Sequence, residues 1–549
     1  MKNIAAMVLA AVLISAGAGC TGNPSASTTT GAGQGFIPGT LRIADIEEPD
    51  TLNPYISTVI TSLDLSLLWG EYFFNVDNHG QYVPEVALQV PTLQNGGISP
   101  DGMTITYHLR RGIKWQDGAP LTAQDVIFTF HAIMNDRNNV QARQGYSEIA
   151  SVTAPDNYTV VVHMAQRYAP IIAYFMGLQG GGPILPAHLL ARYPDMNRVA
   201  WNAKPIGSGP FQVVEWVHGD HMTLVANPNY WRGAPKLHQI IYKWIASNTT
   251  IMTELRTGEA DAWFRADPPL YPQLTQIPGH TVLLTPYSVF GHIDFNLRDP
   301  LLKDVGVRQA VKYGIDRRLI IHDATHDLYL PSNSDQPAFS WAYDRDLPPV
   351  EYNPEKAKAL LDAAGWKPGP DGIRVKNGQR LSLQLSYIGG QVIAPAIGNI
   401  MAQELKAVGI ELTQKGYPVS LFFAAYGNGG ILNTGKYQLA YFGWVQGVDP
   451  DDSGLYLSTQ MPNLPGGGQN SLFWNDPKID QLENDALTTF DVARRQRDYY
   501  AIQLELYDQT PTIIMFAEQR IDAYTDHFHN YVPSPAQSAA WNAYAWSVE

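Results

Sequence analysis

Cysteine is almost absent from this sequence of 549 residues, in which Cys20 is the single example. One cysteine cannot form a disulfide within the chain, so stability has to come from the burial of apolar side chains, and the chain is long enough for two or three domains with such cores. Long apolar runs are also missing after the first twenty residues, whereas a helix that crosses a bilayer needs roughly 18 apolar residues. We therefore expect the main part of the chain to fold outside the membrane.

Positive charge is scarce, with 37 Lys and Arg against 51 Asp and Glu, which gives a net charge of −14. Nucleic-acid binding rests on cationic contacts to phosphate groups, so this composition argues against that partner. The motifs of common catalysts are missing too: the sequence has no Gly-x-Ser-x-Gly elbow, no Walker loop and no Rossmann glycine pattern. Gly466 to Gly468 has no lysine after it and is expected to be a loop. We expect neither an enzyme nor a bound cofactor, although a hydrolase whose paired carboxylates are distant in sequence would leave no local motif.

Metal-ligand patterns are weak. Three short clusters have suitable residue types, namely His218 with His221, His527 with His529, and Asp449 with Asp451 and Asp452. A histidine pair without a third ligand is more simply explained by surface histidines. The acidic cluster lacks the calcium-loop spacing with its central glycine and final glutamate. We predict no metal site.

The N-terminus has the order of a secretory signal. Lys2 gives a positive start, Ile4 to Ile14 is an apolar run, and small residues precede Cys20. This predicts that a lipoprotein signal peptide is removed and that Cys20 receives a lipid, although Gly17 stands where such signals usually carry Leu. The alternative is ordinary secretion with an incidental cysteine. Thr21 to Gly35 is uncharged and rich in small polar residues, which indicates a flexible tether.

Strand and helix patterns alternate through the rest of the chain, which indicates α/β layers. Thr122 and Asn353 have the residue type and position of helix N-caps. Around Pro286 the pattern restarts. The expected elements there include strands at 290–295 and 512–516 and one long helix that runs from residue 305 through Asp316 and Arg317.

A series of motifs resembles one family over its length, from about Leu41 to the C-terminus. In chain order these motifs are Ser99 to Thr104, Leu109 to Gly118, Pro120 to Val126, Pro205 to Phe211, Asn227 to Trp231, Phe295 to Leu297, Asp304 to Ala310, Asp316 to Arg317, Ala357 to Trp366, and Phe442 to Trp444. They are similar to the motifs of the family 5 extracellular solute-binding proteins, which include dipeptide-, oligopeptide- and nickel-binding proteins of ABC importers.

The resemblance implies an α/β, two-lobed periplasmic-binding-protein-like fold (type II, large cluster) with an extra α+β domain inserted in the first lobe. The division that it implies is a signal peptide at 1–19, a tether at 20–38, lobe I at 39–73, the insert at 74–193, lobe I again at 194–286, lobe II at 287–514, and a return to lobe I at 515–549. The implied mechanism is hinge closure on a ligand held between the lobes.

The loop after Trp444 is the informative part of the implied site. Peptide-binding relatives carry an Asp three residues after this Trp, where it pairs with the α-ammonium group of the peptide. This sequence has Gly447 there, and its nearest carboxylate is Asp449. A buried ammonium without a partner costs several kcal/mol. Either Asp449 takes the role of the missing Asp through a different loop path, or the ligand has no free amine. An oligosaccharide is an example of such a ligand.

Aromatic side chains are expected to line the cleft, and Trp341, Trp444, Tyr55 and Tyr287 are the candidates. The sequence thus predicts a monomeric, extracytoplasmic lipoprotein that captures peptides and delivers them to an ABC permease and its ATPase. It is expected in the periplasmic space or on the outer face of the cytoplasmic membrane. The alternatives are an amine-free solute on the same architecture, a metal or metal chelate, and an extracellular hydrolase.

Overall fold

The computed structural model describes residues 35–57, 59–349, 351–464, 467–536 and 539–549. The predicted signal peptide, Cys20 and most of the predicted tether lie outside these residues. Among the described residues, none of the helices combines the length and the apolar character that crossing a bilayer requires.

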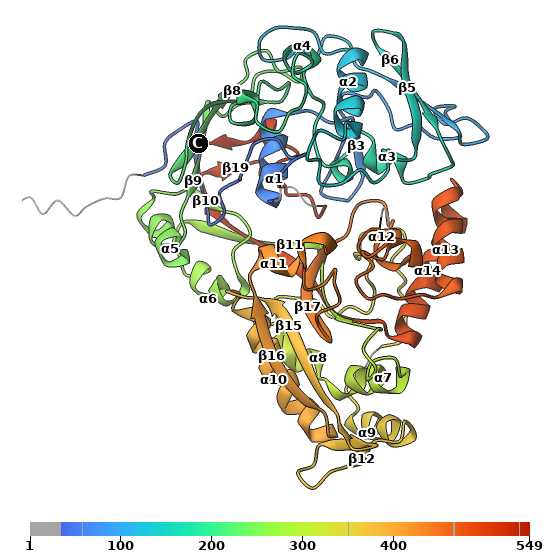
Figure 1. Cartoon of the computed structure of the whole chain (residues 1–549). Coiled ribbons are helices and arrows are strands. Elements are labelled where there is room, and N and C mark those ends of the chain that lie inside the picture. Colours follow the sequence, from blue (N-terminus) through green and yellow to red (C-terminus); the bar gives the residue numbers. More distant parts are fainter. Residues whose placement is uncertain (1–34, 58, 350, 465–466, 537–538) are drawn as a thin grey trace, which may run out of the picture.

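The molecule has two lobes, which lie at the top and the bottom of Figure 1. The first lobe holds β1 (Thr40–Asp45), β7 (Phe211–Val217), β8 (His221–Ala226), β9 (Gln239–Trp244), β10 (Ala262–Trp263), α1 (Ile60–Trp69), α5 (Asn248–Thr257), α6 (Tyr271–Leu274), β19 (Phe528–His529) and β20 (Ser547–Val548). Packed against it are β2 (Phe74–Val76), β3 (Tyr82–Pro84), β4 (Thr104–His108), α2 (Ala123–Met134), β5 (Ile149–Asp156), β6 (Thr159–Met164), α3 (Ile171–Tyr174) and α4 (Ala187–Leu190).

The second lobe holds α7 (Val305–Gly314), α8 (Arg317–Thr325), α9 (Pro354–Ala363), β12 (Lys367–Pro368), β13 (Arg374–Lys376), β14 (Gln379–Arg380), β15 (Ser382–Ile388), α10 (Ile393–Val408), β16 (Glu411–Tyr417), α11 (Val419–Phe422), β17 (Leu439–Val445), α12 (Ser453–Tyr456), α13 (Pro477–Thr488) and α14 (Val492–Gln509). Helices α13 and α14 form the side of this lobe that approaches the β4–β6 region of the first (Figure 1).

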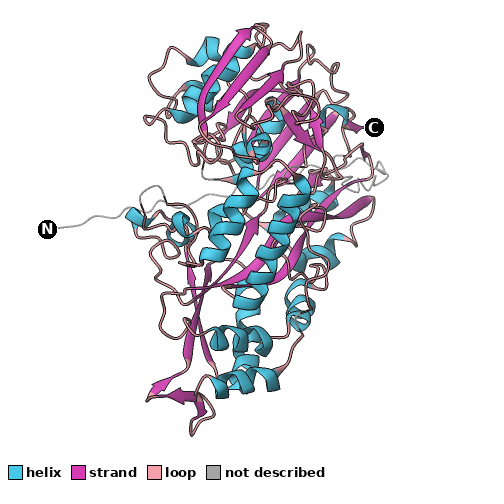
Figure 2. Ribbon diagram, turned by 90° about the vertical axis from the view of Figure 1, so that its right-hand side faces the viewer, coloured by secondary structure: helices cyan, strands magenta, loops and turns pink. Residues whose placement is uncertain are grey.

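One sheet joins the two lobes. Its ten strands run in the order β16-β15-β17-β11-β18-β10-β1-β9-β8-β7. The central strands, β11 (His280–Phe295) and β18 (Thr512–Thr525), are antiparallel to each other and pass from one lobe into the other. β18 pairs with β10 in the first lobe, and β11 pairs with β17 in the second. The long strands are visible in Figure 2. Two continuous strands are therefore the backbone connection between the lobes.

The pairing of the crossing strands is irregular at two neighbouring places, of which the first is the longer interruption; the second lies between Gly291 and His292. The register of β11 on β18 shifts between Pro286 and Phe290, where the partners change from Gln519 to Ala517. Such an irregularity bends a strand and increases its twist. The bend lies at the middle of the molecule, so it is the natural place for a hinge.

The extent of these strands corrects the sequence prediction. The expected strands at 290–295 and 512–516 are the second-lobe ends of much longer strands. Pro286 looked like a boundary because proline lacks the N–H that a sheet needs. In the structure it lies beside the register shift, where the ladder is already broken.

The expected long helix after Val305 is also corrected, because it is two helices. α7 ends before Ile315, which has an extended backbone, and Asp316 caps α8 with hydrogen bonds from Arg318 and Leu319. The local capping predictions are confirmed. Thr122 forms a capping box with Asp125, and Asn353 accepts a hydrogen bond from the Lys356 N–H.

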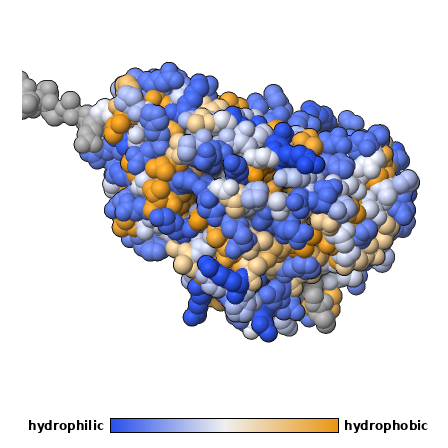
Figure 3. Space-filling view, turned by 90° about the horizontal axis from the view of Figure 1, so that it is seen from above, coloured by the Kyte–Doolittle hydropathy of each residue, from blue (hydrophilic) through white to orange (hydrophobic). Residues whose placement is uncertain are grey.

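The buried apolar side chains form two large cores. One core joins α1 to the sheets of the first lobe and to the β4–β6 region, and includes Trp69 and Trp115. The other lies around the second-lobe half of the large sheet, where it includes Phe295 and Leu385, and it continues into the first lobe at Leu255 of α5 and Trp263 of β10. Viewed from above in Figure 3, the surface is mostly hydrophilic with interspersed apolar residues. The second core therefore packs around the crossing strands, where the two lobes join.

Candidate functional site

A cavity of about 210 Å³ lies between the two lobes. Leu63 of α1, Tyr174 of α3 and Gln179 line it from the first lobe, and Trp444 and Gly447 line it from the second. A ligand held there contacts both lobes and favours the arrangement in which they are close. This cavity is our candidate site.

A larger cavity of about 480 Å³ lies within the second lobe, where Arg317, Ser332 and Tyr343 contribute to its wall. It offers contacts to one lobe alone. Its occupant would have the same contacts whether the lobes were open or closed, so it could not drive closure. Size therefore does not decide between the two cavities.

The loop after β17 contributes three polar side chains to the wall of the inter-lobe cavity, those of Gln446, Asp451 and Asp452. β17 pairs with β11 through Val445, opposite Val289. Directly after it, the Gln446 N–H donates to the Ser288 carbonyl at 2.7 Å. Ser288 lies within the register shift of β11, so the loop begins at the hinge. The candidate site and the hinge are thus connected by backbone contacts.

Asp449 is paired with Arg495 of α14. Nη2 of Arg495 donates to Oδ1 at 2.6 Å and Nη1 donates to Oδ2 at 2.8 Å. Both side chains are almost completely buried. A bidentate pair of this kind uses both carboxylate oxygens and fixes their direction. In this structure Asp449 points at α14, and it is not among the groups that line the cavity.

Gly447 lies directly under the side chain of Gln179. A Cβ at Gly447 would be 1.9 Å from the Gln179 amide nitrogen, closer than any real contact. The same amide accepts a hydrogen bond from the Asp449 N–H at 2.9 Å and reaches the Asp449 carbonyl at 3.5 Å. The place where an acidic side chain would project from residue 447 is therefore filled by a neutral amide from the other lobe.

Asp451 is fully hydrogen-bonded. Its Oδ2 accepts from the Tyr168 hydroxyl at 2.6 Å and from Gln144 Nε2 at 3.1 Å, both across the cleft. Its Oδ1 accepts from the N–H and the hydroxyl of Ser453 at 3.1 and 2.6 Å. Burial raises the pKa of the Tyr168 hydroxyl, and the charge of Asp451 raises it further, so this donor keeps its proton.

Behind this loop lies a group of three buried carboxyl groups, those of Asp335, Asp452 and Glu483. Burial raises the pKa of each, and for Asp452 the neighbouring Glu483 and Asp335 raise it further. Of the three, Asp452 lines the cavity, and its raised pKa favours the neutral acid.

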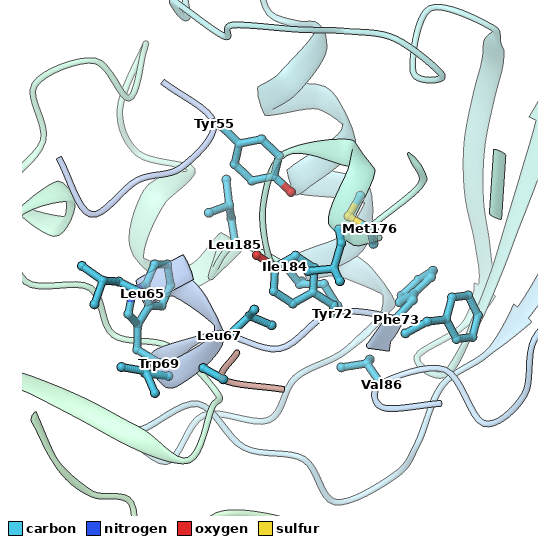
Figure 4. Close-up of a cluster of buried hydrophobic side chains, with 14 of the residues drawn as sticks. Tyr55, Leu65, Leu67, Trp69, Tyr72, Phe73, Val86, Met176, Ile184 and Leu185 are labelled. Atoms are coloured by element: carbon cyan, nitrogen blue, oxygen red, sulfur yellow. The ribbon is translucent and has the colours of Figure 1, made fainter. Parts of the chain in front are cut away.

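The four aromatic candidates are placed differently. Trp444 is half-buried and lines the cavity. Tyr287 lies in the register shift of β11. Trp341 contacts Tyr499 of α14 edge to face and lies 5.3 Å from the Arg495 guanidinium. Tyr55 belongs to the first-lobe core, beside Tyr72 and Leu185 in Figure 4, and donates to the Gly182 carbonyl at 2.7 Å.

Sequence reasoning missed the first-lobe side of the site. Gln144 and Tyr168 come from connections between elements, Tyr174 and Gln179 come from very short helices, and their spacing follows no period. The one available signal was the glycine-rich segment 180–182, which follows Gln179 and indicates a close approach of backbone to neighbouring groups.

Nothing in the described part of the chain groups three or more His, Cys, Asp or Glu side chains so that they could hold a metal ion. The histidines of the predicted surface pair have carboxylate neighbours instead. His218 lies 3.1 Å from Glu48, and His221 lies 3.1 Å from Asp220.

Comparison with known proteins agrees with this architecture. The family model of the bacterial extracellular solute-binding proteins, family 5, matches residues 81–464. The chain belongs to this family. The family consists of proteins that bind solutes outside the cytoplasm, so both the predicted family and the predicted two-lobed α/β fold are confirmed.

Similar proteins are known from several bacteria. The "Oligopeptide-binding protein AppA" of Bacillus subtilis is 25% identical over 99% of this chain and 97% of its own. The "Nickel-binding periplasmic protein" of Escherichia coli is 25% identical over 83% of this chain and 85% of its own.

Solved structures of the same fold include two with bound ligands. AppA from B. subtilis in complex with a nonapeptide has a TM-score of 0.78 at 24% identity, over 93% of this chain and 100% of that one. NikZ from Campylobacter jejuni in complex with Ni(L-His) has a TM-score of 0.80 at 25% identity, with the same coverage of both chains.

Proposed function

We propose that this protein captures peptides between its lobes and delivers them to an ABC importer in the membrane. The observation that carries the proposal is the inter-lobe cavity, whose walls come from both lobes and whose acidic loop begins at the hinge. The oligopeptide-binding relative, similar over nearly its whole length, supports peptides as the ligand class.

The proposed mechanism is closure of the second lobe on the first about the shifted register of β11 and β18. A bound peptide adds contacts to Trp444 and Gly447 on one side and to Leu63 and Tyr174 on the other. These contacts exist together in the closed form alone, so the ligand shifts the equilibrium toward closure. The membrane partner then distinguishes loaded from empty protein by shape.

We also propose that no preformed carboxylate reads the amino end of the peptide. Asp449 is paired with Arg495, Asp451 already accepts four hydrogen bonds, and Gly447 offers no side chain. Asp452 has a pKa raised by burial and favours the neutral acid. A peptide with a blocked amino terminus should therefore bind about as well as a free one.

The second candidate ligand is an amine-free solute such as an oligosaccharide. The same absence of an available carboxylate among the described cavity residues favours it, and the half-buried ring of Trp444 offers a flat apolar surface beside the amides of Gln144, Gln179 and Gln469. Sugars combine apolar faces with hydroxyl groups, so such a wall suits them.

A thermal-shift comparison separates these candidates, because a ligand of the folded state raises the melting temperature by mass action. The ligands are a pool of tri- to pentapeptides, the same pool N-acetylated, and a pool of oligosaccharides of matched concentration. We expect both peptide pools to stabilise the protein equally. Stabilisation by free peptides alone would contradict the proposal about the amino end. Stabilisation by oligosaccharides alone would replace the peptide ligand.

We further propose the predicted anchoring and domain division. Cys20 would carry a lipid that holds a monomeric protein at the membrane. In the domain division, lobe II would extend from 287 to 514, and the insert at 74–193 would belong to lobe I. The change of strand partners between Pro286 and Phe290 supports the first of these boundaries. Incorporation of labelled fatty acid into the wild type and into Cys20→Ser tests the anchor, and the variant should incorporate none.

A further inference from the structure

Beyond the hinge strands, direct hydrogen bonds between protein groups also connect the two lobes. From the first lobe, Gln179 binds the backbone of Asp449, and Tyr168 and Gln144 donate to the carboxylate of Asp451. Beside them, the Ala169 N–H donates to the Leu487 carbonyl at 2.7 Å. These contacts need no ligand, and each exists only when the lobes are close.

The second-lobe side of these contacts is held rigid. Arg495 fixes Asp449 by two hydrogen bonds, and Ser453 fixes Asp451 by two more. Asp449 itself accepts from the Asp451 N–H at 3.1 Å. The loop therefore presents a preformed surface, and little entropy is lost when the first lobe binds it.

We propose that Gln144, Tyr168 and Gln179 form a latch that closes on the loop 447–451, that it sets the balance between open and closed protein, and that Gly447 is required because Gln179 takes the space of any side chain there. Below, "the latch" means these three residues and this loop. It regulates the site of the proposed function, but its existence does not depend on which ligand binds.

The size of the effect follows from the kind of contact. The net contribution of one hydrogen bond is about 0.5–1.5 kcal/mol, which corresponds to roughly a 2- to 10-fold change in an equilibrium constant. The bonds to the charged Asp451 belong to the stronger class. Loss of a latch contact should therefore lower the ratio of closed to open protein by about that factor. Ligand affinity should fall in proportion to the closed fraction, since closed protein is the form that binds well.

The test measures the distance between the lobes without ligand. In a Cys20→Ser background, the exposed residues His163 of β6 and Thr488 of α13 are replaced by Cys and labelled with a fluorescent donor and acceptor. The latch variants are Gln179→Ala, Tyr168→Phe and Gly447→Ala. We expect each to shift the population toward longer distances. We expect Gln179→Ala combined with Gly447→Ala to be no more open than either alone, because both remove the same contact.

Matched controls separate the latch from general damage. Gln124→Ala and Tyr193→Phe change exposed residues of the same types. Gly454→Ala adds a Cβ in the same cavity at an ordinary 3.8 Å from Gln144. All three should leave the distance distribution unchanged, and circular dichroism should be the same for every variant. If the latch variants have the distribution of the wild type, the latch does not exist.

A peptide-binding measurement separates the test of the latch from the test of the proposed function. Peptide titration of the wild type tests the function, and the ratio of affinities between wild type and Gln179→Ala tests the latch. If no peptide binds the wild type, the peptide proposal fails while the distance measurement still decides on the latch. If peptides bind the wild type and Gln179→Ala equally well, the latch has no part in ligand capture.

Discussion

Two of the places where the lobes meet differ in kind. At the hinge, β11 and β18 are connected by the backbone pairing that continues on both sides of the register shift. At the latch, most contacts come from the side chains of Gln144, Tyr168 and Gln179. A backbone ladder forms with almost any side chains, whereas a side-chain contact is lost with one substitution. The connection between the lobes is therefore robust, while the balance between open and closed forms depends on a few residues.

Replacing Arg495 with Met should have the largest effect, because it leaves Asp449 buried without its partner. Breaking a buried ion pair from one side costs about 3–5 kcal/mol of unfolding free energy. Urea denaturation measures this cost. The double variant Arg495→Met with Asp449→Asn should recover most of it. As a control, Lys358→Met removes an exposed pair with Glu355 and should cost less than about 1 kcal/mol. Equal effects of the two single variants would contradict the structural role of the Arg495 pair.

A side chain at Gly291 tests whether the hinge tolerates substitution. A Cβ there would lie 2.3 Å from the Phe516 ring on the paired strand, so Gly291→Ala should destabilise the protein by about 1–3 kcal/mol. Thermal unfolding gives the magnitude. Adding Phe516→Leu should relieve the crowding and recover part of the loss. An unchanged melting temperature would contradict this prediction and would mean that β11 tolerates a side chain at Gly291.

Glu483→Gln should change how stability depends on pH. The pKa of Glu483 is raised above its ordinary 4.5 by burial, so the stability that it contributes is complete below about pH 4.5 and is lost as pH rises toward the folded-state pKa. The difference in melting temperature between variant and wild type should therefore grow in favour of the variant from pH 5 to pH 8. A difference that stays constant, or that favours the wild type as pH rises, would contradict the neutral state of this buried group.

Trp444→Ala should have the smallest effect on folding and a clear effect on binding. Its ring is half-buried at the cavity, between the hinge strand and the latch. We expect a small loss of stability and loss of most of the peptide-induced thermal shift. Trp341→Ala is the comparison, because Trp341 packs on α14 and does not line the cavity. Equal peptide-induced thermal shifts for the two variants would contradict a role of Trp444 in ligand binding.

Local signals made much of the fold predictable. A helix N-cap depends on residues within three positions, so Thr122 and Asn353 could be recognised from their neighbours. The crossing strands were harder. Their first-lobe ends contain Pro286 and, in β18, the buried pair of Arg520 and Asp522, which do not look like a sheet interior until both partners are known.

The candidate site was predictable on one side. The departure at Gly447 and the acidic loop after Trp444 stand out against the family motif, and both are at the cavity or next to it. Gln179 did not stand out, because a glutamine in a very short helix has no pattern of its own. It meets Asp449 across 270 positions of sequence.

The sequence by itself determined the family, the two-lobed α/β fold and the position of the loop, because these depend on motifs and on local propensity. The tertiary structure alone decided the state of each acidic residue in that loop. Asp449 forms an ion pair with Arg495, and Asp451 accepts hydrogen bonds from Tyr168 and Gln144. Asp452, beside Glu483, favours the neutral acid. The physical reason is that the charge and direction of a carboxyl group depend on the groups that surround it in space, and most of these come from distant parts of the chain.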